Sequence, residues 1–253
     1  YKIMQGNSLI ESFMGVDLSK LTYEKEYKKD KGEISLFDDE KNRLQKTVSH
    51  LLSSYYSCSD HDRKVKLQQE ISDTINKQLE AQAYDPTILA KLKEINLAEN
   101  NKFFLWHTWF SDVFNRDDKE GFDIVIGNPP YISAVNMART DEDKLLYRQS
   151  YPEATGAYDM YILFLLLGAK LSSNIYCWII PNKLLVADYA KRTLLKLKAN
   201  NGLEKAIDVS VYDVFKNASV YPIIILGNKK PQMWFAFYKL KNTSTIGQKL
   251  QIC

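Results

Sequence analysis

Apolar positions recur at a spacing of three and four across residues 36–100, in a part of the chain that is otherwise polar and charged. This spacing predicts two long helices that form an antiparallel pair, with a break near residues 57–60. A third helix is predicted over residues 87–95, because Asp85-Pro86 both ends one helix and begins another. We expect this segment to pack on itself, apart from any sheet. The positions that carry the pattern are Leu44, Val48, Leu51, Leu52, Tyr55, Leu67, Ile71, Ile75 and Leu79.

Short apolar runs and amphipathic stretches alternate through the rest of the chain, which predicts the α/β fold class. Such an order is typical of an open parallel sheet with helices on its faces, and the last strands could form a hairpin at its edge. We predict that residues 122–126 form a central parallel strand. Near the start, residues 2–5 resemble a strand and residues 8–14 one or two helical turns. The other expected elements are strands at residues 175–180, 203–209, 220–226 and 233–238, and helices at residues 158–171 and 183–199.

The composition is that of an ordinary globular protein, with 253 residues of which 45% are hydrophobic and 26% charged. The longest apolar stretch, residues 161–169, is too short to span a bilayer, so no membrane partner and a cytoplasmic location are expected. Three scattered cysteines do not form a disulfide framework. A formal charge of +3 does not by itself indicate a nucleic-acid binder, so any affinity for DNA depends on local placement of charge.

The tetrapeptide Asn128-Pro129-Pro130-Tyr131 directly follows the predicted strand at residues 122–126, where open sheets bind ligands. An adenine amine is a poor nucleophile with two hydrogens that can be held. The Asn128 side-chain oxygen can accept one and the Pro129 carbonyl the other, which favours the tetrahedral nitrogen of the transition state. Tyr131 offers a ring on which a flipped base can stack, so Tyr131→Phe should retain most activity. The alternative is a proline-rich turn that caps a buried strand.

Five segments of the chain, in this order, resemble the gamma-class adenine-N6 DNA methyltransferases, among them the large fused restriction-modification proteins. The resemblance implies a Rossmann-like methyltransferase sheet with a long helical insertion, S-adenosylmethionine as cofactor and double-stranded DNA as partner, in a bacterial cytoplasm. It implies three regions: residues 1–35 from the first half of the methyltransferase domain, residues 36–100 as the insertion, and residues 101–253 as the catalytic half. The similar segments are residues 103–107, 122–131, 158–164, 178–183 and 214–222.

Carried over by position, Asn128, Pro129, Pro130 and Tyr131 are expected to form the adenine pocket, with Phe215 as a second aromatic wall for the flipped base. Without the resemblance, an aromatic near a strand start is more typical of a core residue. Two further residues could line the same cleft, although a helix cap and a solvated side chain are equally good interpretations of them. These are Asp159 and Lys183.

The resemblance also places cofactor contacts at Gly6, Asn7 and Asn128. Asn7 stands where the family often has an aspartate that reaches the cofactor adenine. The glycine-containing cofactor loop and the acidic residue that holds the ribose are found nowhere in the 253 residues, so this chain is expected to bind S-adenosylmethionine weakly or not at all. These segments are expected upstream, and a target-recognition domain and a fused nuclease elsewhere in a longer parent protein.

Other functions fit the same tetrapeptide. Enzymes that methylate a glutamine side-chain amide or an RNA amine face the same chemical problem, and a chain without the cofactor loop could be an interaction module with no activity. No metal site is expected, because Cys58 and His61 make one partial pair and no second pair follows at zinc spacing. The basic cluster at residues 191–198 is more typical of a solvated helix face than of a phosphate track.

Overall fold

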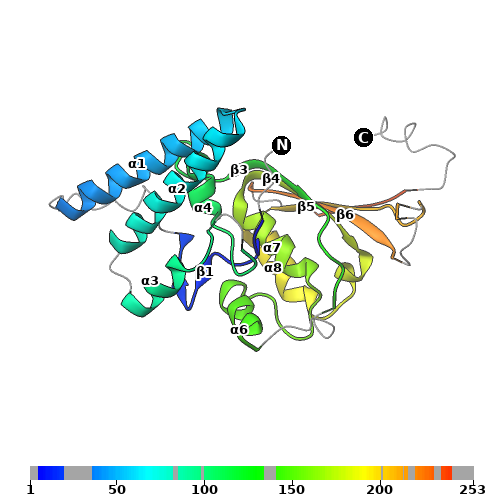
Figure 1. Cartoon of the computed structure of the whole chain (residues 1–253). Helices are drawn as coiled ribbons and strands as arrows, with labels where there is room; N and C mark the ends of the chain where they lie inside the picture. The colour runs from blue at the N-terminus through cyan, green and yellow to red at the C-terminus, as the bar shows by residue number, and fades with distance from the viewer. Residues whose placement is uncertain are drawn as a thin grey trace. The chain divides into compact units, whose positions relative to one another are not determined.

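The computed structural model describes residues 5–19, 36–81, 85–97, 100–133, 141–200, 202–212, 214–215, 220–230 and 235–240. The chain divides into two compact units, residues 1–120 and residues 121–253 (Figure 1). Within the described ranges, none of the helices combines the length and hydrophobicity needed to cross a bilayer.

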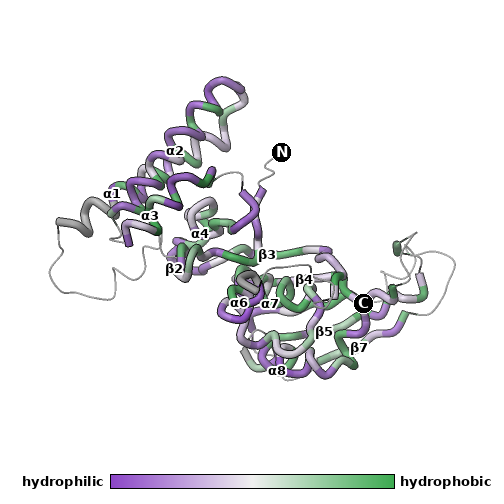
Figure 2. Tube along the Cα trace, turned by 60° about the horizontal axis from the view of Figure 1, so that its bottom comes forward, coloured by the Kyte–Doolittle hydropathy of each residue, from purple (hydrophilic) through white to green (hydrophobic). Residues whose placement is uncertain are grey.

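Two long helices dominate the first unit and confirm the pattern predicted for residues 36–100. They are α1 (Leu36–Ser57) and α2 (His61–Ala81), separated by three residues and packed along each other. Hydrophilic and hydrophobic positions alternate along both (Figure 2), and the apolar stripe is buried. The third helix, α3 (Pro86–Lys93), begins where predicted because the Asp85 carboxylate accepts a hydrogen bond from the Thr87 N–H at 2.8 Å.

The helical turns predicted over residues 8–14 are wrong. A short hairpin stands there instead, formed by β1 (Ser12–Phe13) and β2 (Val16–Asp17). Met14 and Gly15 have φ angles of 49° and 81°, as a two-residue type I′ turn requires. Residues 2–4 of the strand predicted at residues 2–5 lie outside the described residues. Two short helices complete the unit, α4 (Trp106–Trp109) and α5 (Ser111–Phe114).

The second unit contains a five-stranded mixed sheet, which confirms the α/β class. The strand order is β3-β4-β6-β5-β7. β6 was expected at a hairpin edge, but it lies inside the sheet, antiparallel to both neighbours. Its residues 222–226 are apolar on both faces, which suits an interior position. The strands are β3 (Phe122–Gly127), β4 (Ser172–Pro181), β5 (Leu203–Asp208), β6 (Pro222–Asn228) and β7 (Ala236–Lys239).

β3 is parallel, as predicted, but it is not central, because among the described residues its one strand partner is β4. Ile124 and Ile126 are accordingly 57% and 75% exposed. An apolar run predicts a strand that suits burial, whereas its place in the sheet depends on pairings between residues far apart in sequence. Among the described residues, the expectation of a central strand therefore fails, on a property that the local pattern does not contain.

Helices cover one face of this sheet. α7 packs on β3 and β4, and α8 packs on β5 and against α7, above the buried side chains of Tyr176, Trp178 and Ile180. The predicted helix over residues 158–171 is confirmed as α7, but the one over residues 183–199 is interrupted. A 3₁₀ turn, η2, comes first and α8 begins only at Ala190. The helices of this unit are α6 (Asp141–Ser150), α7 (Tyr161–Leu171), η2 (Asn182–Leu185) and α8 (Ala190–Asn200).

Candidate active site

The tetrapeptide begins directly after β3, at the carboxyl end of the strand. Gly127 is the last strand residue, and a Cβ atom there would lie 2.0 Å from the Trp178 ring on β4, so only glycine fits beside the indole. The two prolines that follow have no N–H to extend the ladder. The Asn128 side chain is exposed and makes no hydrogen bond to another described residue, whereas Pro129 is buried. The strand thus ends by presenting a carboxamide to solvent.

Tyr131 is half-buried and anchored at its hydroxyl. Its O–H donates a hydrogen bond of 2.9 Å to the Ile179 carbonyl of β4, beyond the last residue pair of the β3 ladder. Burial raises the pKa of the Tyr131 phenol to about 12, so the hydroxyl keeps its proton at physiological pH. The Phe215 ring lies 6.0 Å away, centroid to centroid, at an interplanar angle of 82°. The two aromatic residues predicted to handle a base therefore come together edge to face.

The residues that follow Tyr131 are joined to the start of α7. Ser133 forms an antiparallel bridge with Asp159, and the Met160 N–H donates a hydrogen bond of 2.8 Å to the Ile132 carbonyl. α7 has no side-chain cap at Met160, so this backbone bond satisfies one of its first N–H donors. Through these contacts the loop after β3 is fixed on both sides, by β4 and by α7.

Asp159 lies at the centre of a hydrogen-bonded cluster that we call the Asp159 cluster, made of Asp159, Tyr161, Lys183 and Tyr189. The Asp159 side chain is 11% exposed. Its Oδ2 atom accepts hydrogen bonds from the Tyr189 hydroxyl at 2.7 Å and from Lys183 Nζ at 3.3 Å. The Tyr161 and Tyr189 hydroxyls lie 2.7 Å apart, and Lys183 Nζ lies 5.4 Å from the centroid of the Tyr189 ring.

The environment of the cluster keeps both phenols protonated. Burial raises the pKa of Tyr161 to about 12, and burial together with the neighbouring Asp159 carboxylate raises the pKa of Tyr189 above its ordinary value. Lys183 differs from its partners because its side chain is 56% exposed. It stands on η2, which follows β4, so its ammonium lies beyond the carboxyl end of a strand parallel to β3. The cluster thus combines a buried anion with one accessible cation.

Gly6 and Asn7, the predicted cofactor contacts, belong to the first unit. A Cβ atom at Gly6 would lie 2.7 Å from the Phe103 carbonyl oxygen, so a larger residue there would collide with the backbone. The Asn7 side-chain oxygen accepts a hydrogen bond from the Leu9 N–H at 3.3 Å, and its carbonyl accepts one from Ile10. The two residues form a tight turn whose carboxamide is half-exposed.

The aromatic segment at residues 103–107 supports that turn. The Trp106 indole N–H donates a hydrogen bond of 2.8 Å to the Ser8 carbonyl. His107 contacts Glu11 twice at 2.7 Å, through its backbone N–H and through ring Nδ1. Residues 5–19 are therefore fastened to residues 103–107 by side chains that are themselves largely buried.

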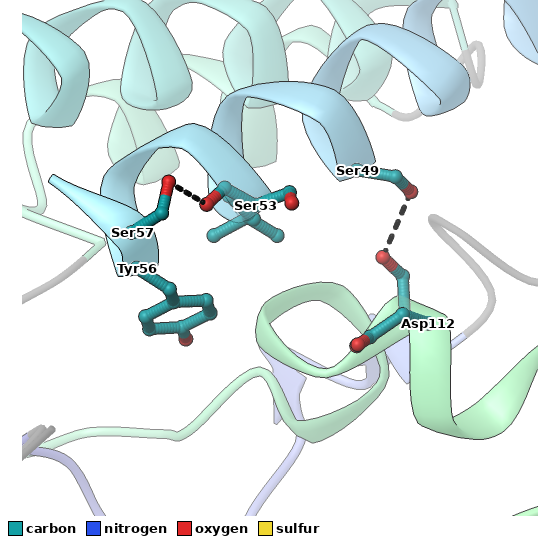
Figure 3. Close-up of a pocket in the computed structure, with 7 residues that line it drawn as sticks. Ser49, Ser53, Tyr56, Ser57 and Asp112 are labelled. Carbon is teal, nitrogen blue, oxygen red and sulfur yellow. Dashed lines mark hydrogen bonds between the residues drawn. The ribbon is translucent and has the colours of Figure 1, made fainter.

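A polar cavity of about 350 Å³ lies in the first unit, between α1 and α5 (Figure 3). Ser49 and Ser111 share a hydrogen bond of 3.0 Å across it, and burial together with Asp112 raises the pKa of Tyr56 to about 12. None of the residues predicted to act on a base or a cofactor lines it. The lining residues are Ser49, Leu52, Ser53, Tyr56, Ser57, Ser111 and Asp112. Elsewhere too, no group of three or more metal-ligating side chains is found among the described residues.

The sequence model of the Eco57I restriction-modification methylases matches residues 11–215, which is most of the chain. The chain belongs to this family. The matched range contains the tetrapeptide, the whole Asp159 cluster and, as its last residue, Phe215. Gly6 and Asn7 precede it. The family assignment thus covers the residues at the carboxyl ends of β3 and β4.

Individual relatives agree with the family. The Escherichia coli type II restriction enzyme and methyltransferase RM.Eco57I is 29% identical over 124 residues, covering 48% of this chain and 12% of that protein. RM.MjaORFECS2P of Methanocaldococcus jannaschii, provisionally named a type II restriction enzyme and methyltransferase, is 28% identical over 205 residues, covering 72% of this chain and 16% of that protein. The chain therefore spans less than a fifth of either relative.

A solved structure gives a weaker likeness. It is provisionally described as a class I S-adenosylmethionine-dependent methyltransferase from Listeria monocytogenes. It has a TM-score of 0.42 and 14% identity, covering 73% of this chain and 59% of that chain.

The sequence did not predict Tyr189, and it gave Tyr161 no role beyond its place in an apolar helix. Asp159 and Lys183 were expected to line the cleft, with a helix cap and a solvated side chain as alternatives. The structure joins them in one ion pair, and Asp159 makes no side-chain cap to α7. The one signal available in advance was that both stand within the segments that resemble the family. No local pattern connects Tyr189 to either of them.

Proposed function

We propose that the protein transfers a methyl group from S-adenosylmethionine to the exocyclic amine of adenine in double-stranded DNA, within a restriction-modification system. The observation that carries this proposal is the exposed Asn128 carboxamide directly after β3, three residues before Tyr131, whose ring meets the Phe215 ring edge to face. Membership of a restriction-modification methylase family supports the substrate class. Because both relatives are named as restriction enzymes too, we extend the proposal to a longer protein with nuclease and target-recognition domains.

Asn128 and Pro129 have the chemistry to activate the amine. The Asn128 Oδ1 atom accepts one amine hydrogen and the Pro129 carbonyl accepts the other, and both bonds strengthen as the nitrogen becomes tetrahedral. Burial of the Pro129 ring fixes the backbone that carries this carbonyl. No general base is needed, because the product amine can lose its proton to water.

Tyr131 and Phe215 hold the flipped base in different ways. A base that stacks parallel to Tyr131 stands nearly perpendicular to Phe215, since the two rings are 82° apart. Phe215 therefore contacts the base with an edge, and the expected second parallel wall becomes an edge-to-face contact, which aromatic pairs also favour. The Tyr131 hydroxyl bond to β4 sets the plane in which the base is received.

The cofactor, when bound, supplies an already activated methyl group. Asn128 is the candidate contact in residues 121–253. In residues 1–120 the candidate is the Gly6–Asn7 turn, whose half-exposed carboxamide carries both the donor and the acceptor that suit an adenine ring. The lack of a side chain at Gly6 fits this role, because it lets the turn lie directly against the Phe103 backbone, which fixes its position.

The experiment that tests the function uses the full-length protein that carries this sequence, with isotopically labelled S-adenosylmethionine. Three acceptors are compared: plasmid DNA, RNA, and a glutamine-containing peptide. After digestion of the DNA to nucleosides, mass spectrometry should find the label in N6-methyldeoxyadenosine. Label in the RNA or on the glutamine, with none in DNA, would replace the proposal by one of the two alternative methyl acceptors.

A further inference from the structure

Asp159 is a buried carboxylate, and such a group is costly unless it is partnered. Its two side-chain partners are unequal. Lys183 is more than half exposed and lies 3.3 Å away, so water and salt screen this ion pair. The Tyr189 hydroxyl lies 2.7 Å away within the protein. Tyr189 is therefore the stronger hydrogen-bond partner of the Asp159 carboxylate.

The two tyrosines form a chain of hydrogen bonds with a fixed direction. A phenol has one proton, and Tyr189 donates it to the Asp159 carboxylate, which can only accept. The bond of 2.7 Å between the tyrosines must therefore run from the Tyr161 O–H to the Tyr189 oxygen. In this way the chain of bonds joins the first turn of α7 to the segment between η2 and α8.

The backbone of Asp159 connects the same network to the residues that follow the tetrapeptide. Its bridge to Ser133, with the neighbouring bond from Met160 N–H to the Ile132 carbonyl, holds the two residues directly after Tyr131. A shift of Asp159 therefore moves Ser133, and with it the loop that carries Tyr131. Asp159 lies at the junction of three segments: its backbone joins the loop after β3 to the start of α7, and its carboxylate reaches the segment before α8.

We propose that Asp159, held by Tyr189 and Tyr161, is the positioning residue of the base pocket. It acts on the target base through Tyr131, without touching the base. This inference rests on the proposed function, because it assigns the cluster to the pocket of that reaction. It also explains why the predicted helix over residues 183–199 is interrupted: the non-helical residues 186–189 bring the Tyr189 hydroxyl to Asp159.

The test is Tyr189→Phe in the full-length protein, which removes the bonding hydroxyl and leaves the ring. Steady-state methylation should show kcat lowered by about threefold to tenfold, because a small displacement of Tyr131 misplaces the target base relative to the groups that act on it. KM and the equilibrium affinity for the duplex should stay within about twofold, because binding rests on phosphate contacts elsewhere. A duplex with 2-aminopurine at the target position should show altered emission, since its stacking on Tyr131 changes.

The matched control is Tyr176→Phe, because Tyr176, like Tyr161, is fully buried in this unit but its hydroxyl has no partner among the described residues. It should leave kcat unchanged. At position 159, Asn keeps an oxygen that accepts from Tyr189 and Leu does not, so Asp159→Asn should retain clearly more kcat than Asp159→Leu. If a position-159 variant does not fold, Tyr161→Phe, which removes only the end of the chain of bonds, gives a smaller loss in the same direction.

The outcome that overturns the inference is specific. If Tyr189→Phe melts at a lower temperature than the parent but keeps the parental kcat and 2-aminopurine emission, the cluster serves stability alone. Failure of the proposed function has a different signature, because the label would then be absent from DNA in the parent protein, or substitution of Asn128 would leave DNA methylation unchanged. A protein in which Asn128 matters and Tyr189 does not keeps the function and loses this inference.

Discussion

Asn128 and Asp159 both carry polar side chains near the carboxyl end of β3, but they are held in opposite ways. The Asn128 carboxamide is exposed and bonds to no other described residue. The Asp159 side chain is 11% exposed and accepts hydrogen bonds from Tyr189 and Lys183. One group is ready for a ligand, and the other is already satisfied by the protein.

This difference separates two tasks that a catalytic pocket must perform. A group that stabilises a transition state has to offer its hydrogen-bonding capacity to the substrate, whereas a group that fixes geometry gains from partners present at all times. Tyr131 stands between these cases, because its ring is half-exposed while its hydroxyl is bonded to Ile179. The effects of substitutions at these three kinds of position should therefore differ in size and in kind.

The largest effect is expected for Asn128→Ala in the full-length protein. Removing one preorganised partner of a transition state typically lowers the rate by about a hundredfold or more. Affinity for DNA should change little, because Asn128 is proposed to bind the adenine amine and not a phosphate. Single-turnover methylation of an adenine duplex, measured alongside equilibrium binding of the same duplex, separates the two quantities. Methylation at the parental rate would leave the tetrapeptide as a turn that caps a strand.

A smaller effect is expected at Tyr131, and it should differ between two substitutions. Tyr131→Ala removes a stacking face worth roughly 1–3 kcal/mol, so both capture and methylation of the flipped base should weaken. On stacking alone, Tyr131→Phe should retain most activity. The hydroxyl bond to Ile179 changes this expectation, because its loss frees the ring to turn.

We therefore expect Tyr131→Phe to methylate several-fold more slowly than the parent, with unchanged affinity for the duplex, consistent with a hydrogen bond worth about 1 kcal/mol. The same two assays distinguish the variants. Equal activity of Tyr131→Phe and the parent would show that packing against Phe215 suffices to orient the ring.

The parts of the fold that follow from local pattern could be predicted from the sequence. α1 and α2 keep an apolar stripe at helical spacing over five or six turns, and α7 is apolar almost throughout. The local pattern could not predict which strands, far apart in the sequence, pair with one another. β6 enters between β4 and β5, and β3 lies at an edge of the sheet formed by the described residues, because strand order depends on which apolar faces meet.

The candidate site shows the same division. Asn128 to Tyr131 are consecutive and follow a strand, so their place at its carboxyl end could be predicted. Phe215 needed the family resemblance, since nothing near it in sequence points to Tyr131. The Asp159 cluster draws side chains from three separate segments, and Tyr189 falls where the amphipathic pattern predicts an unbroken helix. Hydrogen bonds between such segments leave no periodic trace in a sequence.

The smallest effect, and the sharpest comparison with the cluster, is expected at Tyr176. Its side chain is as buried as that of Tyr161, and its ring packs on the Gly227 backbone, where a Cβ atom would lie 2.1 Å away. Burial raises the pKa of the Tyr176 phenol, so the hydroxyl stays neutral. It nevertheless has no hydrogen-bond partner among the described residues, whereas the Tyr161 hydroxyl bonds to Tyr189.

Substitution by phenylalanine at positions 161 and 176 should therefore affect the free energy of unfolding differently. Tyr161→Phe leaves a bonded group without its partner and should lower the free energy of unfolding by about 1–3 kcal/mol, while Tyr176→Phe removes an unpaired group and should leave it unchanged or raise it by about 1 kcal/mol. For a chain of this size each kcal/mol moves the melting temperature by roughly 2–4 °C, so calorimetry can resolve the two. Equal losses in both variants would mean that a bound water satisfies the Tyr176 hydroxyl. The bond from Tyr161 to Tyr189 would then contribute no more to the free energy of unfolding than such a water does.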